Sequence, residues 1–142
     1  MKAMEKCPFC KIAGGELACE KVYEDDLVIA FLDIAPLTKG HTLVIPREHH
    51  HSVTTLPTPL AARLMQTAAN IGAALMRTVD GDGFNLLVAN GPCAGQTVPH
   101  AHVHVLPRRP DDGLVLPART VHYDDADEKA AILEETRRRL ES

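Results

Sequence analysis

The stretch that most constrains this chain runs from Gly95 to Arg108 and reads GQTVPHAHVHVLPR. It contains three histidines, His100, His102 and His104, each separated from the next by a single apolar residue. Successive side chains of a strand point to opposite faces, so this spacing predicts a strand with all three imidazoles on one face. Neighbouring imidazoles would lie roughly 6–7 Å apart, and the intervening side chains would face an apolar core.

Three explanations of this row of imidazoles are open at this point. It is a site for chemistry beside the turn around Gly91 and Gly95, a solvated strand face with an excess of histidine, or a metal site that uses two of the three rings. Backbone N–H groups of a glycine-containing turn can donate to phosphate oxygens. The turn and the aligned imidazoles together favour the first explanation.

The composition restricts the class of protein. The chain has 142 residues, 45% of them apolar and 24% charged, which predicts one globular domain with a substantial core. A net charge of −4 gives no general attraction to nucleic acid or to an anionic membrane. No apolar run approaches the ~20 residues of a membrane span and residues 1–6 do not resemble a signal peptide, so we expect a cytoplasmic location.

Hydrophobic patterning predicts the elements around the histidine strand. Apolar residues that recur every three or four positions predict a long helix over 59–79, with a stripe broad enough to serve also in a subunit contact. A charged helix over 127–140 would be a peripheral or dimer-edge element rather than part of the core. The last predicted strand before the histidines would pair with them as an antiparallel hairpin. The predicted strands, of which the third is apolar enough to be buried on both faces, are 21–24, 27–34, 41–45 and 84–89.

The motif Cys7-Pro-Phe-Cys10 favours a metal-binding knuckle over a redox pair. A redox pair of the thioredoxin type follows a strand, and only six residues precede this motif. Two thiolates supply half of a tetrahedral zinc site. One of His49, His50 and His51 is a natural further ligand, but the spacing does not choose among them.

Asp33 lies at the end of the predicted strand 27–34, just before Ala35 and Pro36. Its carboxylate could accept a hydrogen bond from a ligand hydroxyl, or it could cap the turn ahead of the proline. The residues alone leave both roles open.

Together these motifs resemble the histidine triad (HIT) family of nucleotide hydrolases and transferases. The alternation from His100 to Leu106 gives that family its name, and the resemblance covers most of the chain, from Cys7 to Arg108. Segments that stand in family order are Cys7-Pro-Phe-Cys10-Lys-Ile, Val22-Tyr-Glu-Asp-Asp, Ala30-Phe-Leu-Asp-Ile, Lys39-Gly-His-Thr-Leu-Val-Ile-Pro and Gly95-Gln-Thr-Val.

The resemblance implies an α+β fold. Its parts would be a five-stranded antiparallel sheet with one long helix packed on it, a short N-terminal zinc knuckle and a C-terminal helix. A HIT domain would span residues 1–110, followed by a C-terminal extension over 111–142 with a peripheral helix. Such proteins usually pair as a two-fold homodimer.

The resemblance also implies an activity. The middle histidine, His102, would attack the α-phosphorus of a purine nucleotide and form a nucleotidyl-histidine that water hydrolyses, with His104 at the phosphate oxygens or the leaving group. The implied substrates are nucleoside phosphoramidates, dinucleoside polyphosphates and adenylylated small molecules. A free imidazole has a pKa of about 6.5, so a substantial fraction is neutral and nucleophilic at pH 7.

Positions within the family segments imply the substrate contacts. Asp33 resembles the ribose-binding acid, Gln96 and Thr97 resemble a phosphate-contacting pair, and His41 matches a histidine behind the triad. The implied set is Phe31, Asp33, Ile34, His41, Asn90, Gly95, Gln96 and Thr97.

The resemblance implies a zinc site as well. Its ligands would be Cys7, Cys10, His49 and His100. Four protein ligands close a zinc site, which points to a structural metal rather than a water-activating one.

One position departs from the family pattern. Relatives commonly carry a polar amide directly before the position of Asn90, where this chain has Ala89. Adjacent strand residues face opposite sides, so Asn90 replaces that amide only if a bulge turns it inward. A lost hydrogen bond costs on the order of 1 kcal/mol. A nucleotide-binding or scaffold protein with residual turnover is therefore an alternative, as is a hydrolase with His100, His102 and His104 on a catalytic zinc.

Overall fold

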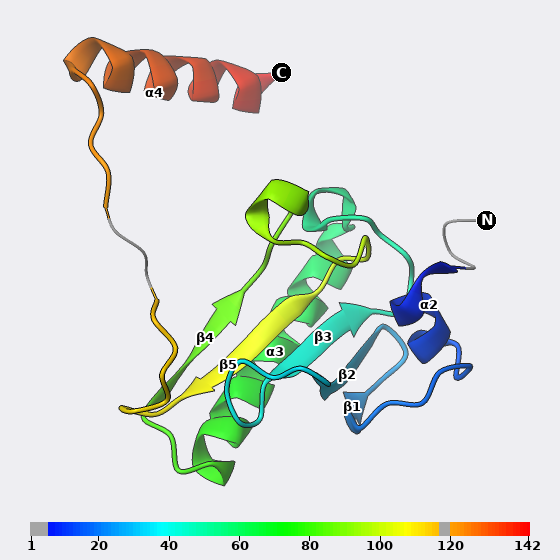
Figure 1. Ribbon diagram of the computed structural model, residues 1–142. Coiled ribbons are helices and arrows are strands. Elements are labelled where there is room, and N and C mark those ends of the chain that lie inside the picture. Colours follow the sequence, from blue (N-terminus) through cyan, green and yellow to red (C-terminus); the bar gives the residue numbers. More distant parts are fainter. Residues whose placement is uncertain (1–5, 117–119) are drawn as a thin grey trace.

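The computed structural model describes residues 6–116 and 120–142, and its centre is a five-stranded antiparallel sheet (Figure 1). The strand order is β1-β2-β3-β5-β4, so the two halves of the chain meet where β3 pairs with β5. This confirms the predicted sheet. The strands are β1 (Lys21–Glu24), β2 (Val28–Leu32), β3 (Thr42–Pro46), β4 (Gly83–Leu87) and β5 (Val103–Arg108).

The middle strand, β3, is covered on both faces. All five of its residues are buried, as its continuous apolar run predicted. Val44 faces the side of the sheet on which Leu64 and Ala68 pack. Its neighbours Leu43 and Ile45 face the other side. The sheet therefore divides the core into two layers.

One long helix, α3 (Thr58–Thr78), covers one face of the sheet (Figure 1). It begins after Pro57, within one residue of the predicted start, because Pro59 fits the first turn of a helix. The apolar stripe read from the periodicity is the buried side of this helix. Its buried residues are Leu60, Leu64, Thr67, Ala68, Ile71 and Gly72.

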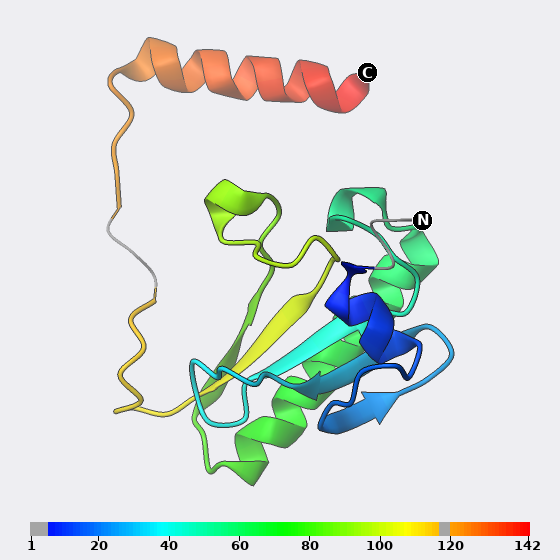
Figure 2. The ribbon, with the colours of Figure 1, turned by 45° about the vertical axis from the view of Figure 1, so that its right-hand side comes forward.

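The opposite face of the sheet carries only a short helix, α2 (Pro8–Ala13), as Figure 2 shows. Phe9 is its buried residue and packs edge-on against Phe31 of β2, with ring centroids 5.6 Å apart. A helix of six residues covers much less of a sheet than α3 does. Two single-turn helices, η1 (Val53–Thr55) and η2 (Pro92–Ala94), lie in the loops that follow β3 and precede β5.

The C-terminal helix, α4 (Ala126–Glu141), lies apart from the sheet in both views (Figures 1 and 2). Its N-cap is Asp125, whose carboxylate accepts the N–H of Glu128 at 2.8 Å. None of its residues is buried. None of the described helices combines the length and apolar content that a membrane span requires.

We expect Gly72→Ala to destabilise the fold. A Cβ at this position would lie 2.5 Å from ring atoms of Phe84, so the helix could not stay as close to β4. Overpacking costs about 2 kcal/mol in the middle of its usual range and alanine returns up to about 1 kcal/mol of helix propensity, so the free energy of unfolding should fall by about 1–2 kcal/mol in urea denaturation. The double variant Gly72→Ala/Phe84→Leu should recover part of the loss. An unchanged stability of Gly72→Ala would contradict this account.

Candidate active site and metal centre

The histidine segment enters the sheet later than its periodicity predicted. β5 begins at Val103, and His100 lies in a turn where its N–H donates to the Val98 carbonyl at 2.8 Å. The Ala101 N–H holds this turn in place by donating to the His50 carbonyl at 2.6 Å. The prediction that one strand carries all three histidines is therefore wrong, because only His104 lies in β5, and each ring has its own surroundings.

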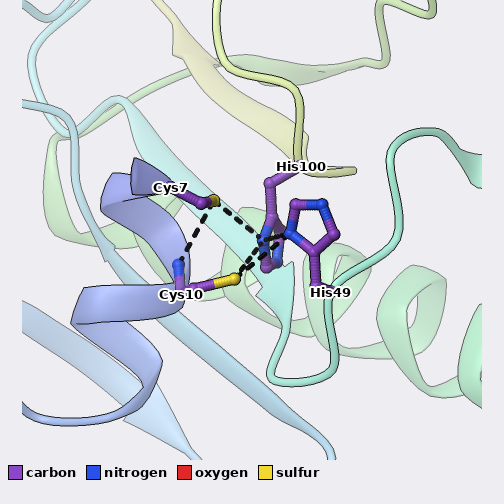
Figure 3. Close-up of side chains that lie close together, drawn as sticks. All are labelled: Cys7, Cys10, His49 and His100. Atoms are coloured by element: carbon purple, nitrogen blue, oxygen red, sulfur yellow. Dashed lines mark hydrogen bonds between the residues drawn. The ribbon is translucent and has the colours of Figure 1, made fainter. Parts of the chain in front are cut away.

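Four potential metal ligands gather where α2, the loop after β3 and the turn before β5 meet (Figure 3). The ligand atoms of Cys7, Cys10, His49 and His100 all lie within 4.8 Å of one another. Sγ of Cys10 lies 3.2 Å from Nδ1 of His49 and 3.5 Å from Nδ1 of His100. Sγ of Cys7 lies 3.4 Å from Nδ1 of His100, and the two Nδ1 atoms lie 3.2 Å apart.

These separations fit a tetrahedral site. Zn–S bonds of about 2.3 Å and Zn–N bonds of about 2.0–2.1 Å place a sulfur and a nitrogen ligand about 3.5 Å apart and two nitrogens about 3.3 Å apart. Nε2 of His100 donates to the Pro46 carbonyl at 2.8 Å, which leaves Nδ1 with a free lone pair toward the cysteines. The four side chains can therefore hold a metal ion that prefers sulfur and nitrogen.

The other two histidines of the loop lie outside this group. Nδ1 of His50 lies 3.2 Å from Oγ1 of Thr55, and its Nε2 lies 3.3 Å from Oε1 of Glu48. His51 is exposed. Of the three candidates that the spacing left open, the structure brings His49 to the cysteines.

The protonation of the Cys10 thiol would respond strongly to a bound cation. Burial raises the pKa of the Cys10 thiol to about 11, and the hydrogen bond and charge of Cys7 add to the rise. A bound metal ion reverses this shift, because coordination deprotonates thiols. Both cysteines are free of disulfides.

His102 is buried and held by a backbone carbonyl. Its Nδ1 donates to the His100 carbonyl at 2.7 Å, which leaves Nε2 as the lone pair of the neutral ring. Phe9 meets this ring edge-on with centroids 5.2 Å apart, and the His104 ring lies 4.8 Å away. The neutral ring thus has one tautomer, with its basic nitrogen free.

His104 and His41 form a hydrogen-bonded pair beside His102. The Leu37 N–H donates to Nδ1 of His41 at 3.0 Å, so neutral His41 carries its proton on Nε2. That Nε2 donates to Nδ1 of His104 at 2.9 Å, which leaves the His104 proton on its own Nε2. Burial lowers the pKa of both rings, that of His104 to about 4, and His102 nearby lowers them further. Both rings are therefore neutral at pH 7.

Asp33 caps the turn that follows β2. Its Oδ1 accepts the Ala35 N–H at 2.8 Å, while Oδ2 lies 3.5 Å from Nε2 of His41. Asp33, His41 and His104 form a second group of potential metal ligands. Their hydrogen bonds oppose that use, because Nε2 of His41 carries a proton directed at His104 rather than a lone pair.

A cavity of about 390 Å³ adjoins His102 and His104. Its walls are mostly apolar and come from α2, the loop after it, β2 and β3. Four of the residues expected to bind substrate line it: Phe31, Asp33, Ile34 and Thr97. A larger cavity of about 510 Å³ lies at the other end of β5 and contains no histidine.

The sequence interpretation missed other residues of this wall. Phe9, Cys19 and Leu43 also line the cavity. Leu43 could have been found from strand alternation, because it pairs with His104 across the sheet and so shares its face. Phe9 lies between the two cysteines in the sequence, and their metal-binding pattern gives no sign that its ring faces the cavity.

Four expected residues are absent from the cavity wall. His41 lies behind His104, and Gly95 adopts a left-handed conformation with φ of 99° at the end of η2. Oδ1 of Asn90 accepts the Val53 N–H at 3.1 Å. Gln96 is buried and its amide is hydrogen-bonded within the protein. Their roles toward a substrate stay predictions.

Two named relatives resemble the chain over most of its length. It is 42% identical over 108 residues to an adenylylsulfatase, HINT3, of Arabidopsis thaliana, covering 76% of this chain and 55% of the relative. The chain thus spans about half the length of that relative. It is 39% identical over 102 residues to the adenosine 5'-monophosphoramidase hnt1 of Schizosaccharomyces pombe, covering 72% of this chain and 74% of the relative.

A solved structure supports the same kinship. A zinc-bound histidine triad family protein from Mycobacterium smegmatis superposes with a TM-score of 0.75 at 34% identity, covering 97% of each chain. The HIT domain family model matches residues 14–111, which contain the whole sheet, α3 and the three histidines. The chain belongs to the HIT domain family.

Proposed function

We propose that this protein is a nucleotide hydrolase or nucleotidyl transferase that acts at the α-phosphate of nucleoside phosphoramidates or dinucleoside polyphosphates with a purine base. The observation that carries the proposal is the tautomer of His102, whose Nδ1 proton is held by a carbonyl while the ring lines the cavity. Relatives named as an adenylylsulfatase and an adenosine 5'-monophosphoramidase support a hydrolase of this kind.

In the proposed reaction, Nε2 of His102 attacks the α-phosphorus. An N–P bond forms, and the bond from phosphorus to the leaving group breaks. The ring becomes positively charged, and the His100 carbonyl stabilises this charge through the Nδ1 proton that it already accepts. The leaving group takes a proton from water, and attack of a second water on phosphorus frees the histidine, so one difficult transfer becomes two easier ones.

His104 contributes a hydrogen bond in this scheme. Its Nδ1 accepts from His41, so its Nε2–H is available to a phosphate oxygen or to the leaving group. Giving up that proton would leave an anionic ring, since Nδ1 is already occupied. We therefore assign His104 as a donor that binds the phosphate rather than as the acid that protonates the leaving group.

The cavity provides places for the rest of the nucleotide. Phe31 and Ile34 offer apolar surface for a purine, and Oδ2 of Asp33 is free to accept a ribose hydroxyl while Oδ1 caps its turn. Thr97 lines the side near His102 and offers a hydroxyl to the phosphate. These assignments follow the family segments and the position of each residue on the cavity wall.

The metal is proposed to be zinc in a structural role at Cys7, Cys10, His49 and His100. Four protein ligands leave no open coordination position, and when bound the ion links α2 to the loop after β3 and to the turn before β5. A catalytic zinc on all three histidines is disfavoured. In the described part of the chain, His102 belongs to neither group of potential ligands.

We also propose a cytoplasmic homodimer that binds neither nucleic acid nor membrane. β4 is an edge strand, and Met65 of the adjoining α3 is half exposed, which suits a contact with a second copy. The net charge of −4 disfavours binding to polyanions.

A second candidate is a nucleotide-binding protein with residual turnover. Oδ1 of Asn90 is held by the Val53 N–H, which restricts the turning of this side chain, and the position before it is Ala89, which has no amide to offer to a phosphate. Losing one such contact costs on the order of 1 kcal/mol, which is several-fold in rate. Binding of a nucleotide with negligible turnover across a substrate panel would favour this candidate.

A trapped intermediate tests the nucleophile. Incubation with an adenosine phosphoramidate, acid quench and mass spectrometry should find one adenylyl group on His102. His102→Ala should carry no adduct and should lose at least about 10³-fold in kcat, because the nucleophile is removed. His122→Ala, at an exposed histidine, is the matched control and should keep the adduct. An adduct that survives His102→Ala would show that another group attacks.

Metal analysis tests the zinc assignment. Cys10→Ser should bind less than one zinc per chain and lower the melting temperature by roughly 5 °C or more, since metal binding is linked to folding. Cys93→Ser removes an exposed thiol and should keep both zinc and stability. Full zinc in Cys10→Ser together with zinc loss in His102→Ala would instead support the three-histidine metal site.

The pair of His41 and His104 predicts a pH dependence. Folded His104 stays neutral down to about pH 4, whereas an unfolded histidine takes up a proton near pH 6.5. The unfolded chain then binds more protons, so the stability is complete above pH 6.5 and falls as the pH drops toward 4, by up to about 1.4 kcal/mol per pH unit for this group. Histidine ¹⁵N shifts of zinc-loaded protein should show neutral His104 at pH 5.5. A midpoint near 6.5 would contradict the buried pair.

A further inference from the structure

Gln96 is buried, and its side chain is already committed to the protein. Its Oε1 accepts the Gly91 N–H at 2.8 Å. Its Nε2 donates to the His51 carbonyl at 2.7 Å and to the Val98 carbonyl at 3.0 Å. A glutamine amide has two N–H donors, and both are used. A phosphate oxygen needs a donor, so direct contact would require breaking one of these two bonds.

The three bonds join two segments that serve different parts of the site. His51 lies two residues after the metal-ligand candidate His49, in the loop that follows β3. Gly91 and Val98 flank the turn that carries Thr97 to the cavity. Besides the ligand cluster and the bond between Ala101 and His50, Gln96 is thus a further link between the metal loop and this turn.

We propose that Gln96 is a positioning residue, which ties the turn that presents Thr97 to the cavity to the loop that presents His49 to the metal. The inference rests on the proposed zinc site and nucleotide pocket, and it replaces the phosphate contact that the family segments imply for Gln96. Thr97, which lines the cavity, is left to meet the phosphate. Gln96 keeps both neighbouring groups in register without touching either the metal or the substrate.

Zinc release from the full-length protein distinguishes the two roles. In Gln96→Met the side chain keeps its length and loses all three hydrogen bonds. The release rate of zinc to a coloured chelator should rise at least about tenfold, because the loop that carries His49 loses the donor to its His51 carbonyl. Gln96→Glu keeps an acceptor for Gly91 but sets a carboxylate against two carbonyls, so it should also release zinc faster.

Thr97→Val is the matched control. It changes the neighbouring residue, which lines the cavity, and makes no hydrogen bond to the metal loop in the described chain. It should weaken binding of AMP relative to adenosine in calorimetry while zinc leaves at the wild-type rate. Zinc release at the wild-type rate from Gln96→Met, with AMP binding weakened as in Thr97→Val, would overturn the proposal and restore the phosphate contact.

Hydrogen exchange of the wild-type protein gives a test that needs no variant to fold. The Gly91 N–H is protected only while Oε1 of Gln96 accepts it. Saturation with AMP should leave this protection unchanged or raise it, whereas a rotation of the whole Gln96 amide toward the phosphate, which also withdraws Oε1, would expose Gly91 and speed its exchange. None of these readouts needs turnover. If the protein bound AMP and zinc but did not hydrolyse a phosphoramidate, the proposed reaction would be refuted. Zinc release and hydrogen exchange would still decide the role of Gln96.

Discussion

The site depends on the way in which His100 is bonded. Its Nε2 donates to the Pro46 carbonyl, its Nδ1 faces Cys7 and Cys10, and its own carbonyl accepts the Nδ1 proton of His102. The ring is fully buried, and burial lowers its pKa to about 4, so it is a neutral ligand at pH 7. His100 thus offers its ring as a candidate metal ligand, and its backbone carbonyl orients the candidate nucleophile. A change at the proposed metal site would therefore have to cross only this residue to reach His102.

The different roles of the histidines come from their backbone partners rather than from their spacing. A carbonyl at Nδ1 leaves His102 with a lone pair on Nε2, whereas an N–H at Nδ1 of His41 leaves the proton on Nε2. In the second arrangement Nε2 of His41 donates a hydrogen bond to Nδ1 of His104, which leaves the His104 proton on Nε2 as a donor. Two neighbouring rings therefore offer opposite polarity to a phosphate: a basic nitrogen and an acidic N–H. A phosphoryl group needs both, one at phosphorus and one at its oxygens.

Local sequence patterns predicted the sheet and α3 well, because the burial of strand and helix residues follows the periodicity of those elements. The continuous apolar run of β3 and the stripe of α3 each satisfy a period that the sequence displays directly. The hydrogen-bond and ligand partners of the site residues could not be predicted from such periodicities. His49 was one of three adjacent histidines, and the side chains of Asn90 and Gln96 turned to the Val53 N–H and to carbonyls of distant loops. Hydrogen bonds between residues far apart in the sequence fix these loops, and hydrophobic periodicity carries no information about them.

The position of the cavity follows from the short length of α2, which covers only part of the sheet face. A helix of six residues is too short to be stable alone, and Phe9 is its one fully buried residue. Cys7 and Cys10 face the ligand cluster on one side of α2, where the proposed metal would add an attachment, and Phe9 reaches His102 on the other. A longer helix held by packing, as on the α3 side, would cover the histidine face and close the cavity. The small helix leaves that face open, and the cavity beside His102 and His104 lies there.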